Sequence, residues 1–326
     1  MSGVPEEGQS DAGGHERTTR GEFRAQVNAR KADLERQFEA SKAQFDVAQE
    51  KINARTGRNL LVAILIGLVF GGAVLLSLLV VKELFMLLAV VIAGFASYEL
   101  AQALRKADYR VPRIPTVVVA VAAVPLAYYG GAGAQLIAVL GGIAVVTIWR
   151  LVEQGLPGRS TGRALVRDLS AGAFVQGYVT FLATFAVVLT AADGGELWTL
   201  AFIMAAVAAD TGAYAFGLMF GKHKMAPVIS PKKTWEGFAG GAATSVVAGL
   251  LISLFLLGNT WWFGLLFGAA IFLSATLGDL VESLIKRDIG IKDMSSWLPG
   301  HGGFLDRLDS ILPSAAVAFV AFRIFG

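Results

Sequence analysis

Long apolar runs separated by short polar loops make up most of this chain, and they follow a polar first segment. A transmembrane helix needs about 20 apolar residues to cross about 30 Å of hydrocarbon. On this criterion the pattern predicts nine spans, near residues 59–81, 84–104, 114–130, 132–149, 169–191, 196–220, 237–257, 260–285 and 311–325. We therefore expect an all-α, polytopic membrane domain over residues 59–326.

Residues 1–58 form a polar tail with ten Lys or Arg and ten Asp or Glu. The tail lacks the basic start, short apolar core and cleavage site of a signal peptide. Residues 1–19 have a composition typical of disorder. Between Gly21 and Ala54, apolar residues recur at intervals of seven and four, which predicts an amphipathic helix. We favour a helix on the membrane or on the protein itself over a partner-binding coiled coil, because polar residues interrupt the short heptad pattern.

Composition supports the membrane assignment. The chain of 326 residues is 55% hydrophobic and 16% charged, which is too apolar for an ordinary soluble domain. It contains no cysteine, so disulfide bonds and thiolate metal ligands are excluded.

The basic residues of the loops predict the orientation. The loops after the first, third, fifth and seventh spans carry only Lys82. The loops after the even-numbered spans carry sixteen basic residues: Arg105, Lys106, Arg110, Arg113, Arg150, Arg159, Arg163, Arg167, Lys222, Lys224, Lys232, Lys233, Lys286, Arg287, Lys292 and Arg307. The positive-inside rule therefore places these loops and the N-terminal tail in the cytoplasm.

The last of these loops, residues 283–309, is unusually dense in charge. Its four basic residues are Lys286, Arg287, Lys292 and Arg307, and its four carboxylates are Asp288, Asp293, Asp306 and Asp309. Carboxylates can hold a divalent cation, basic side chains can hold phosphate, and glycine lets backbone N–H groups approach an anion. The loop therefore predicts a phosphate and metal site at a membrane surface. Asp288 and Asp293 are more simply explained as solvated or ion-paired residues.

A second polar block, SPKKTWEG at 230–237, lies in the loop after the sixth span. Lys232 and Lys233 can neutralise a polyphosphate, and Ser230 and Thr234 can donate to phosphate oxygens and cap the following helix. Taken alone, this loop is more simply a positive-inside anchor.

Several carboxylates are expected inside or at the ends of spans, where charge is costly and often marks a site. Asp279 and Glu282 share a helix face near the end of the eighth span. Metal ligation is the favoured role for Asp279, whereas for Glu282 a ligand and a structural role are equally weighted. Asp210 is expected to support the site. For Glu99, an ion pair, a hydrogen bond to a neighbouring helix and a catalytic role stay open.

Both polar blocks resemble the phosphatidate cytidylyltransferases, which make CDP-diacylglycerol from CTP and phosphatidic acid. The resemblance covers residues 210–310, including the D-x-x-A-Y string that begins at Asp210. The elements of the long signature are Ser283, Lys286-Arg287, Lys292-Asp293, Pro299, His301-Gly302-Gly303, Asp306-Arg307 and Asp309. With both blocks present, the nucleotide-binding interpretation of SPKKTWEG is favoured.

The resemblance implies a nucleotidyltransferase of phospholipid biosynthesis, with CTP, phosphatidic acid and the bilayer as partners. We expect an integral protein of the cell inner membrane or an equivalent membrane, with a cytoplasmic active site and no nucleic-acid partner. A homodimer is a candidate assembly. The expected cofactor is Mg²⁺, and the resemblance implies a monovalent cation such as K⁺ as a candidate second ion.

The site residues divide into three expected roles. The catalytic set is Asp279, Lys286, Arg287, Asp306, Arg307 and Asp309. The substrate-binding set is Ser230, Lys232, Lys233, Thr234, Glu236, Lys292, His301, Gly302 and Gly303. The metal ligands are Asp279, Asp306 and Asp309. Because the attacking phosphate monoester is already largely ionised at neutral pH, we expect His301 to bind phosphate or organise the loop rather than act as a base.

Three alternatives remain. A related membrane kinase for polyprenol or phytol would use a similar site but transfer the γ-phosphate of CTP, and the long signature argues against it. An ion-coupled transporter would use the buried carboxylates as a charge pathway, but the polar residues gather at one membrane face. An inactive scaffold would not need so many carboxylates.

Overall fold

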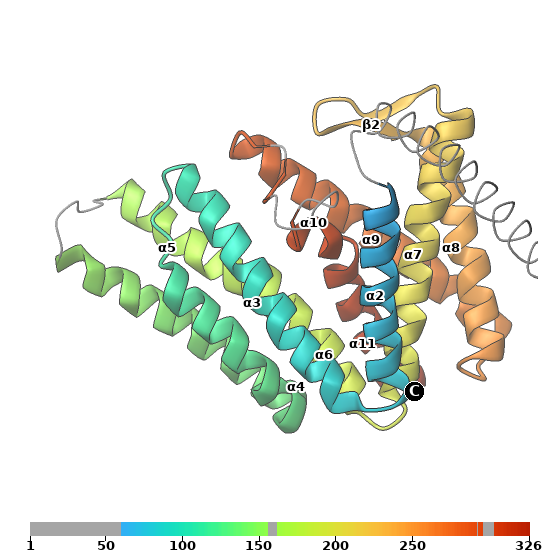
Figure 1. Cartoon of the computed structure of the whole chain (residues 1–326), viewed down its shortest axis with the longest axis horizontal. Helices are drawn as coiled ribbons and strands as arrows, with labels where there is room; N and C mark the ends of the chain where they lie inside the picture. Colours follow the sequence, from blue (N-terminus) through green and yellow to red (C-terminus); the bar gives the residue numbers. More distant parts are fainter. Residues whose placement is uncertain (1–59, 156–161, 292, 296–302) are drawn as a thin grey trace, which may run out of the picture. The chain divides into compact units, whose positions relative to one another are not determined.

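The computed structural model describes residues 60–155, 162–291, 293–295 and 303–326, which are mostly helical (Figure 1). Within these residues, seven helical segments are long and apolar enough to cross a membrane. The expected helical, multi-pass class is thus confirmed, while the count of nine spans stays a prediction. The chain divides into two compact units, Met1–Ala63 and Ile64–Gly326. The predicted amphipathic helix of the tail lies outside the described residues.

The elements follow the predicted apolar runs closely. The α-helices are α2 (Leu60–Leu79), α3 (Lys82–Lys106), α4 (Arg113–Val152), α5 (Arg163–Val175), α6 (Leu182–Ala191), α7 (Gly195–Phe220), α8 (Trp235–Phe255), α9 (Trp261–Asp288), α10 (Leu305–Leu308) and α11 (Ile311–Phe325). The remaining elements are the short helix η1 (Glu153–Gly155), the π-helical segment η2 (Gln176–Phe181) and the strands β1 (Lys224–Ala226) and β2 (Ser230–Thr234).

Helix α4 is interrupted at Gly131, which has a φ of 67° and a ψ of −161°. A positive φ of this kind strains residues with a side chain, but glycine adopts it readily. The segments before and after Gly131 lie against each other, since a Cβ placed on Gly142 would be 2.2 Å from Val119 Cγ1. The two spans predicted near 114–130 and 132–149 therefore correspond to the two halves of α4.

The fifth predicted span is one continuous segment of α5, η2 and α6, and it begins at Arg163 rather than near residue 169. The sequence criterion placed the start too late because it treated Asp168 as a loop residue. In the structure Asp168 is buried and paired, with its Oδ2 atom 2.8 Å from Arg150 Nη2 and its Oδ1 atom accepting from Arg110 N. Neutralisation by this pair lets the helix extend through a charged position.

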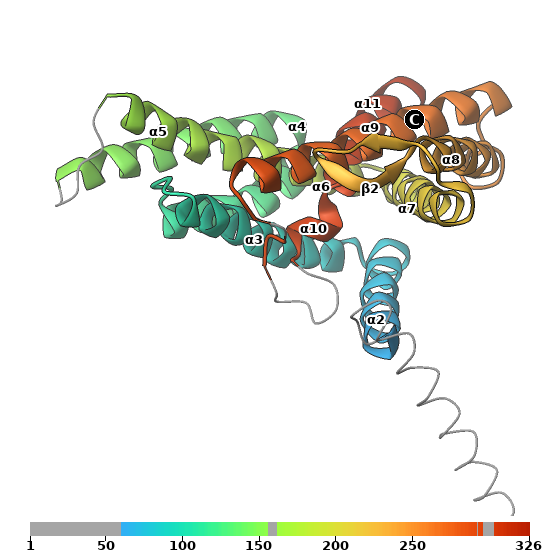
Figure 2. The same ribbon diagram turned by 90° about the horizontal axis from the view of Figure 1, so that it is seen from above.

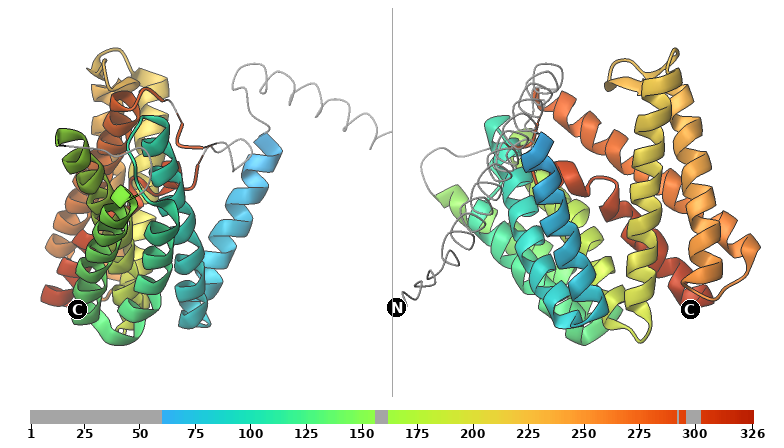
Figure 3. Two further views of the ribbon diagram at one scale, coloured as in Figure 1. Left: turned by 90° about the vertical axis from the view of Figure 1, so that its left-hand side faces the viewer. Right: turned by 45° about the vertical axis from the view of Figure 1, so that its right-hand side comes forward.

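Helices α7, α8 and α9 lie side by side (Figure 3). Their contacts use small residues: a Cβ added to Gly268 would lie 2.4 Å from the Ser245 carbonyl oxygen, and Thr244 Oγ1 donates to Ala208 O at 2.9 Å. Close approach through glycine and hydroxyl residues is typical of helix packing in membranes. It aligns the ends of α7 and α9 with the start of α8, where the second polar block lies.

Strands β1 and β2 form an antiparallel hairpin between α7 and α8, with Lys224 opposite Thr234 and Ala226 opposite Ser230 (Figure 2). The all-α prediction is wrong for this segment. The strands are only three and five residues long, so the sequence carries too short a pattern to separate a hairpin from a loop.

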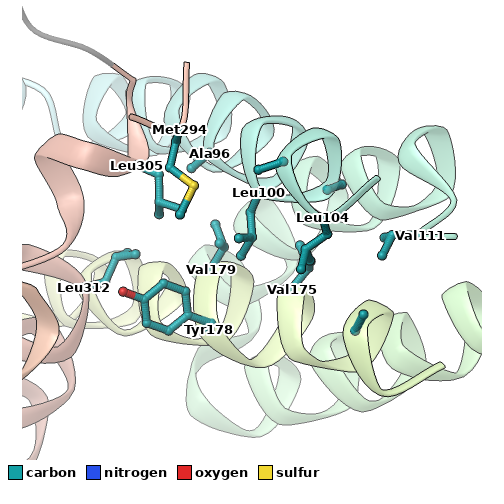
Figure 4. Packing of buried hydrophobic residues seen from close by; sticks show 13 residues of the cluster. Ala96, Leu100, Leu104, Val111, Val175, Tyr178, Val179, Met294, Leu305 and Leu312 are labelled. Atoms are coloured by element: carbon teal, nitrogen blue, oxygen red, sulfur yellow. The ribbon is translucent and has the colours of Figure 1, made fainter. Parts of the chain in front are cut away.

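A cluster of buried apolar residues packs α3 against α5, η2 and the loop that precedes α10 (Figure 4). Leu305 is fully buried there and Met294 is 5% exposed. Helix α10 therefore lies between α3 and α9 (Figure 2). Residues 289–305, which lead from α9 into the start of α10, are called the signature loop below. Met294 and Leu305 anchor this loop in the apolar cluster on the two sides of residues 296–302.

Candidate active site

The second polar block, on β2, and the end of α9, where the charge-dense loop begins, meet in space although they are far apart in the sequence. Lys233 Nζ on β2 lies 2.6 Å from Asp279 Oδ2 on α9. One turn later on α9, Ser283 Oγ donates to Asp279 Oδ1 at 3.3 Å. Near the end of α9, Arg287 Nε donates to Ile229 O in the hairpin at 3.2 Å. The hairpin and the C-terminal end of α9 therefore lie together, while their joint role in substrate binding stays a prediction.

Thr234 caps α8 as the sequence predicted. Its backbone is extended, and its Oγ1 atom accepts a hydrogen bond from Gly237 N at 3.1 Å. Ser230 does not share this role, because it lies four residues earlier in β2 and pairs with Ala226. Lys232 is exposed, whereas its neighbour Lys233 is partly buried and faces Asp279. Successive residues of a strand point to opposite faces, which explains the difference.

Glu236 was expected to bind substrate, but in the structure its carboxylate is occupied within the protein. It accepts from the backbone N–H groups of Lys222 and His223, at 3.1 Å and 3.2 Å, and lies 2.6 Å from His223 Nδ1. Glu236 thereby holds the turn that leads from α7 into the hairpin. The expected role of Glu236 in substrate binding is not tested by these contacts and stays a prediction.

Lys286 is the centre of a buried charge network. Its Nζ atom lies 2.5 Å from Glu282 Oε2, one turn earlier on α9, and 3.0 Å from Asp306 Oδ1 on α10. Glu282 is fully buried, and the side chain of Lys286 is 16% exposed. Burying a carboxylate is costly unless it is paired, so the network fixes the relative positions of α9 and α10.

Asp306 accepts two further hydrogen bonds from the signature loop. Gly303 N donates to its Oδ2 atom at 2.7 Å, and Met294 N donates to the same atom at 3.3 Å. Glycine in such a loop can serve either a turn or an anion-binding nest. The N–H group of Gly303 is already bound by a carboxylate, which favours the structural role for this glycine.

Asp309 directly follows α10 and lies near further charged residues. Its Oδ1 atom accepts from Ser310 N at 2.7 Å. Its carboxylate lies within electrostatic range of Asp279, Asp210 and Lys286. The backbone of Asp309 also contacts α9, since a Cβ on Gly278 would meet its carbonyl oxygen at 2.0 Å. Asp306 and Asp309 are three residues apart in a backbone that keeps helical φ and ψ through Asp309, and both carboxylates lie within electrostatic range of Lys286.

Asp210 on α7 belongs to this second acidic group. Ser310 Oγ donates to its Oδ1 atom at 3.4 Å, and Asp279, Lys233 and Arg307 lie within electrostatic range. Arg307 itself is exposed on α10. The supporting position expected for Asp210, near the basic loop, agrees with this placement.

The acidic residues are suitable in kind for a hard cation, because carboxylate oxygens are the donors that Mg²⁺ prefers. Among the described residues, no three His, Cys, Asp or Glu side chains are already close enough to hold a metal ion by themselves. The metal roles of Asp279, Asp306 and Asp309 thus stay predictions. Lys292, His301 and Gly302, which were assigned to substrate binding, lie outside the described residues.

The sequence left the role of one buried residue near the site, Glu99, open and did not indicate another, Tyr178. Glu99 on α3 is 1% exposed and contacts the signature loop. A carboxylate within an apolar span indicated that Glu99 has a special role, but the sequence did not show which residues contact it. Tyr178 in η2 is 9% exposed, and its hydroxyl lies within electrostatic range of Glu282, Asp309 and Asp279. No sequence motif includes Tyr178, which lies in the π-helical segment η2.

Comparisons with known proteins agree with the two-block pattern. Residues 61–325 match the Cytidylyltransferase family. A phosphatidate cytidylyltransferase of Mycobacterium bovis is 41% identical over 273 residues, covering 82% of this chain and 89% of the relative. A protein of the same name from Mycobacterium leprae is 41% identical over 281 residues, covering 82% and 89%. One from Staphylococcus epidermidis is 51% identical over 104 residues, covering 32% of this chain and 40% of the relative.

Proposed function

Because this chain belongs to the cytidylyltransferase family, we propose that it transfers the cytidylyl group of CTP to phosphatidic acid. The products are CDP-diacylglycerol and pyrophosphate. The observation that carries the proposal is the 41% identity, over 82% of the chain, to proteins named phosphatidate cytidylyltransferase. The contact between Lys233 and Asp279 supports it, since it joins the second polar block to the end of α9, just before the charge-dense loop begins at Ser283.

The reaction needs charge neutralisation more than proton transfer. A phosphate oxygen of phosphatidic acid forms a bond to the α-phosphorus of CTP, and the bond from that phosphorus to the oxygen bridging to the β-phosphate breaks. The electron pair leaves with pyrophosphate, and no proton must be removed from the ionised nucleophile. Catalysis of this kind depends on positioning and electrostatic stabilisation.

Basic residues from three elements, β2, α9 and α10, are suited to this task. We assign Lys232 and Lys233 on β2 to the triphosphate, where the N-terminus of α8 adds a favourable dipole. Lys286, Arg287 and Arg307 are assigned to the lipid phosphate and the departing pyrophosphate. Lys233 and Lys286 are held by carboxylates in the described structure. Substrate phosphates would compete with those carboxylates for the same ammonium groups.

The acidic group fits a divalent cation. Asp210, Asp279 and Asp309 come from three helices and lie within range of mutual repulsion, which a bound cation would relieve. Mg²⁺ usually takes one or two carboxylates together with phosphate oxygens and water, so a preformed three-residue cage is not required. Asp279, Asp306 and Asp309 are the proposed ligands, and K⁺ is a candidate second ion. When bound, Mg²⁺ would neutralise charge developing on the phosphate oxygens.

The distribution of charged contacts supports a cytoplasmic site in a chain of nine spans. Lys82, at the start of α3, pairs with Glu196, at the start of α7, with 2.7 Å between Nζ and Oε2. Both residues come from loops with few basic residues. The basic loops contribute Arg150 near the end of α4, Lys233 in the hairpin and Lys286 near the end of α9. We propose that this basic side faces the cytoplasm, as the positive-inside rule requires.

Purified protein in detergent tests the proposal directly. With CTP, Mg²⁺ and phosphatidic acid, it should release pyrophosphate and form a liponucleotide, and omission of any one of the three should stop both. Pyrophosphate release that does not depend on phosphatidic acid would contradict the assigned acceptor.

A further inference from the structure

Glu99 binds the signature loop through three hydrogen bonds. Its Oε1 atom accepts from Ser295 Oγ at 2.5 Å and from Phe304 N at 3.0 Å, and its Oε2 atom accepts from Leu305 N at 2.9 Å. The side chain projects from α3 and is 1% exposed. A buried carboxylate in an apolar helix is costly unless donors surround it. The three donors meet this requirement.

The donors lie on both sides of residues 296–302. Ser295 precedes this segment, and Phe304 and Leu305 follow it. A single carboxylate on α3 therefore fixes the two ends of the loop that leads from α9 to α10. The neighbouring ring of Phe95, one turn earlier on α3, stacks on Phe304 with 4.9 Å between ring centroids and 9° between planes.

Gly303 connects Glu99 to Asp306. A Cβ at Gly303 would lie 2.8 Å from Glu99 Oε2 and 3.1 Å from Asp306 Oδ2, so the backbone passes between the two carboxylates. The N–H group of Gly303 donates to Asp306 Oδ2 at 2.7 Å. Asp306 in turn forms an ion pair with Lys286, with 3.0 Å between Oδ1 and Nζ. The placement of a proposed metal ligand and a proposed phosphate ligand thus depends on where Glu99 holds the loop.

We propose that Glu99 is a positioning residue for the transferase reaction, which sets the location of Asp306 and Lys286 without touching substrate. The inference rests on the proposed function and extends it to a residue outside both polar blocks. A carboxylate is needed because it accepts at both oxygens, whereas glutamine would turn an NH₂ group toward at least one of the donors.

The variant that tests this is Glu99→Gln, which keeps the size of the side chain. We expect kcat to fall about 10- to 100-fold, as is common when a group that orients a metal ligand is changed, with a smaller change in KM for CTP. In hydrogen–deuterium exchange without substrate or metal, the amides of Phe304 and Leu305 should exchange faster than in wild type. Ser97→Ala is the matched control, since Ser97 is buried on the same helix and its Oγ atom has no hydrogen-bond partner among the described residues.

Wild-type kcat in folded Glu99→Gln protein would overturn the inference, and so would unchanged exchange at Phe304 and Leu305. If Glu99→Gln does not fold, Ser295→Ala decides, because it removes one donor and leaves the buried carboxylate in place. We expect a several-fold loss of kcat and faster exchange there, and wild-type values for both would overturn the inference. Failure of wild-type protein to form a liponucleotide would refute the proposed function separately, while the exchange comparison would still report on the Glu99 contacts.

Discussion

Lys233 and Asp279 form an ion pair, 2.6 Å long, between a hairpin and the last turns of a membrane helix. In the proposed site, one partner would bind the triphosphate and the other the cation. Each therefore holds the other in place before substrate arrives, and both must exchange partners when the metal-bound nucleotide enters. The side chains are 22% and 32% exposed, so water and ligands can reach them.

Loss of the Lys233 charge should weaken nucleotide use with little effect on folding. For Lys233→Met we expect kcat/KM for CTP to fall about 100-fold, since a charge-assisted contact to phosphate contributes about 3 kcal/mol. Partly exposed ion pairs contribute little to stability, about 1 kcal/mol or less, so the unfolding temperature should barely change. Steady-state kinetics and a thermal unfolding curve provide the two measurements. Lys106→Met is the matched control, because Lys106 is an exposed lysine at the end of α3. Equal losses in the two variants would argue for a general charge effect.

The two aspartates of α10 and its C-terminal end should each be required for turnover. Asp306→Asn and Asp309→Asn should lower kcat by about 100-fold or more, because stabilisation of charge on the phosphates by a cation contributes several kcal/mol. Activity measured across a range of Mg²⁺ concentrations should show a higher requirement in both variants. Asp288→Asn, at the exposed end of α9, serves as the control. Wild-type rates in Asp306→Asn and Asp309→Asn would remove the metal assignment.

The sequence predicted the helices well because length and apolar content alone define them. The start of α7 at Gly195 and the bounds of α11 fall within one residue of the predicted limits. The turn at Gly131 also followed from the pattern, since glycines there separate two apolar runs. The charge rule placed SPKKT and the end of the eighth span at one membrane face, which agrees with the contact between Lys233 and Asp279.

Side-chain partners could not be predicted in the same way. The sequence did not predict that Glu236 accepts a hydrogen bond from Lys222 N, or that Gly303 N donates one to Asp306. The partner of Glu99 lies about 200 residues away in the sequence, and no local pattern encodes such a contact.

Lys286 should contribute to stability as well as to catalysis. In Lys286→Met the carboxylate of Glu282, which is fully buried, would keep Asp306 as a neighbour but lose its counter-charge. Breaking a buried ion pair from one side typically costs about 3–5 kcal/mol. We therefore expect a clearly lower unfolding temperature in detergent. In the double variant Glu282→Gln, Lys286→Met the loss should be smaller, because no unpaired charge is left at position 282. A double variant less stable than Lys286→Met would contradict this account of the network.

The proposed sidedness can be tested on a clean background, because the chain has no cysteine. Asp193→Cys places a thiol in the loop between α6 and α7, and Val228→Cys places one in the hairpin, where Val228 is 85% exposed. A membrane-impermeant maleimide added to intact cells should label Asp193→Cys and not Val228→Cys. Val228→Cys should react after the membrane is permeabilised. Labelling in the reverse order would place the site on the outer side.

The fate of the CTP phosphates tests the central claim most directly. Purified protein would be given phosphatidic acid, Mg²⁺ and CTP labelled at either the α- or the γ-phosphate, and the lipid would then be extracted. The account predicts that the lipid product carries the α label, while the γ label leaves in pyrophosphate. A lipid that acquires the γ label would contradict it and identify the protein as a kinase.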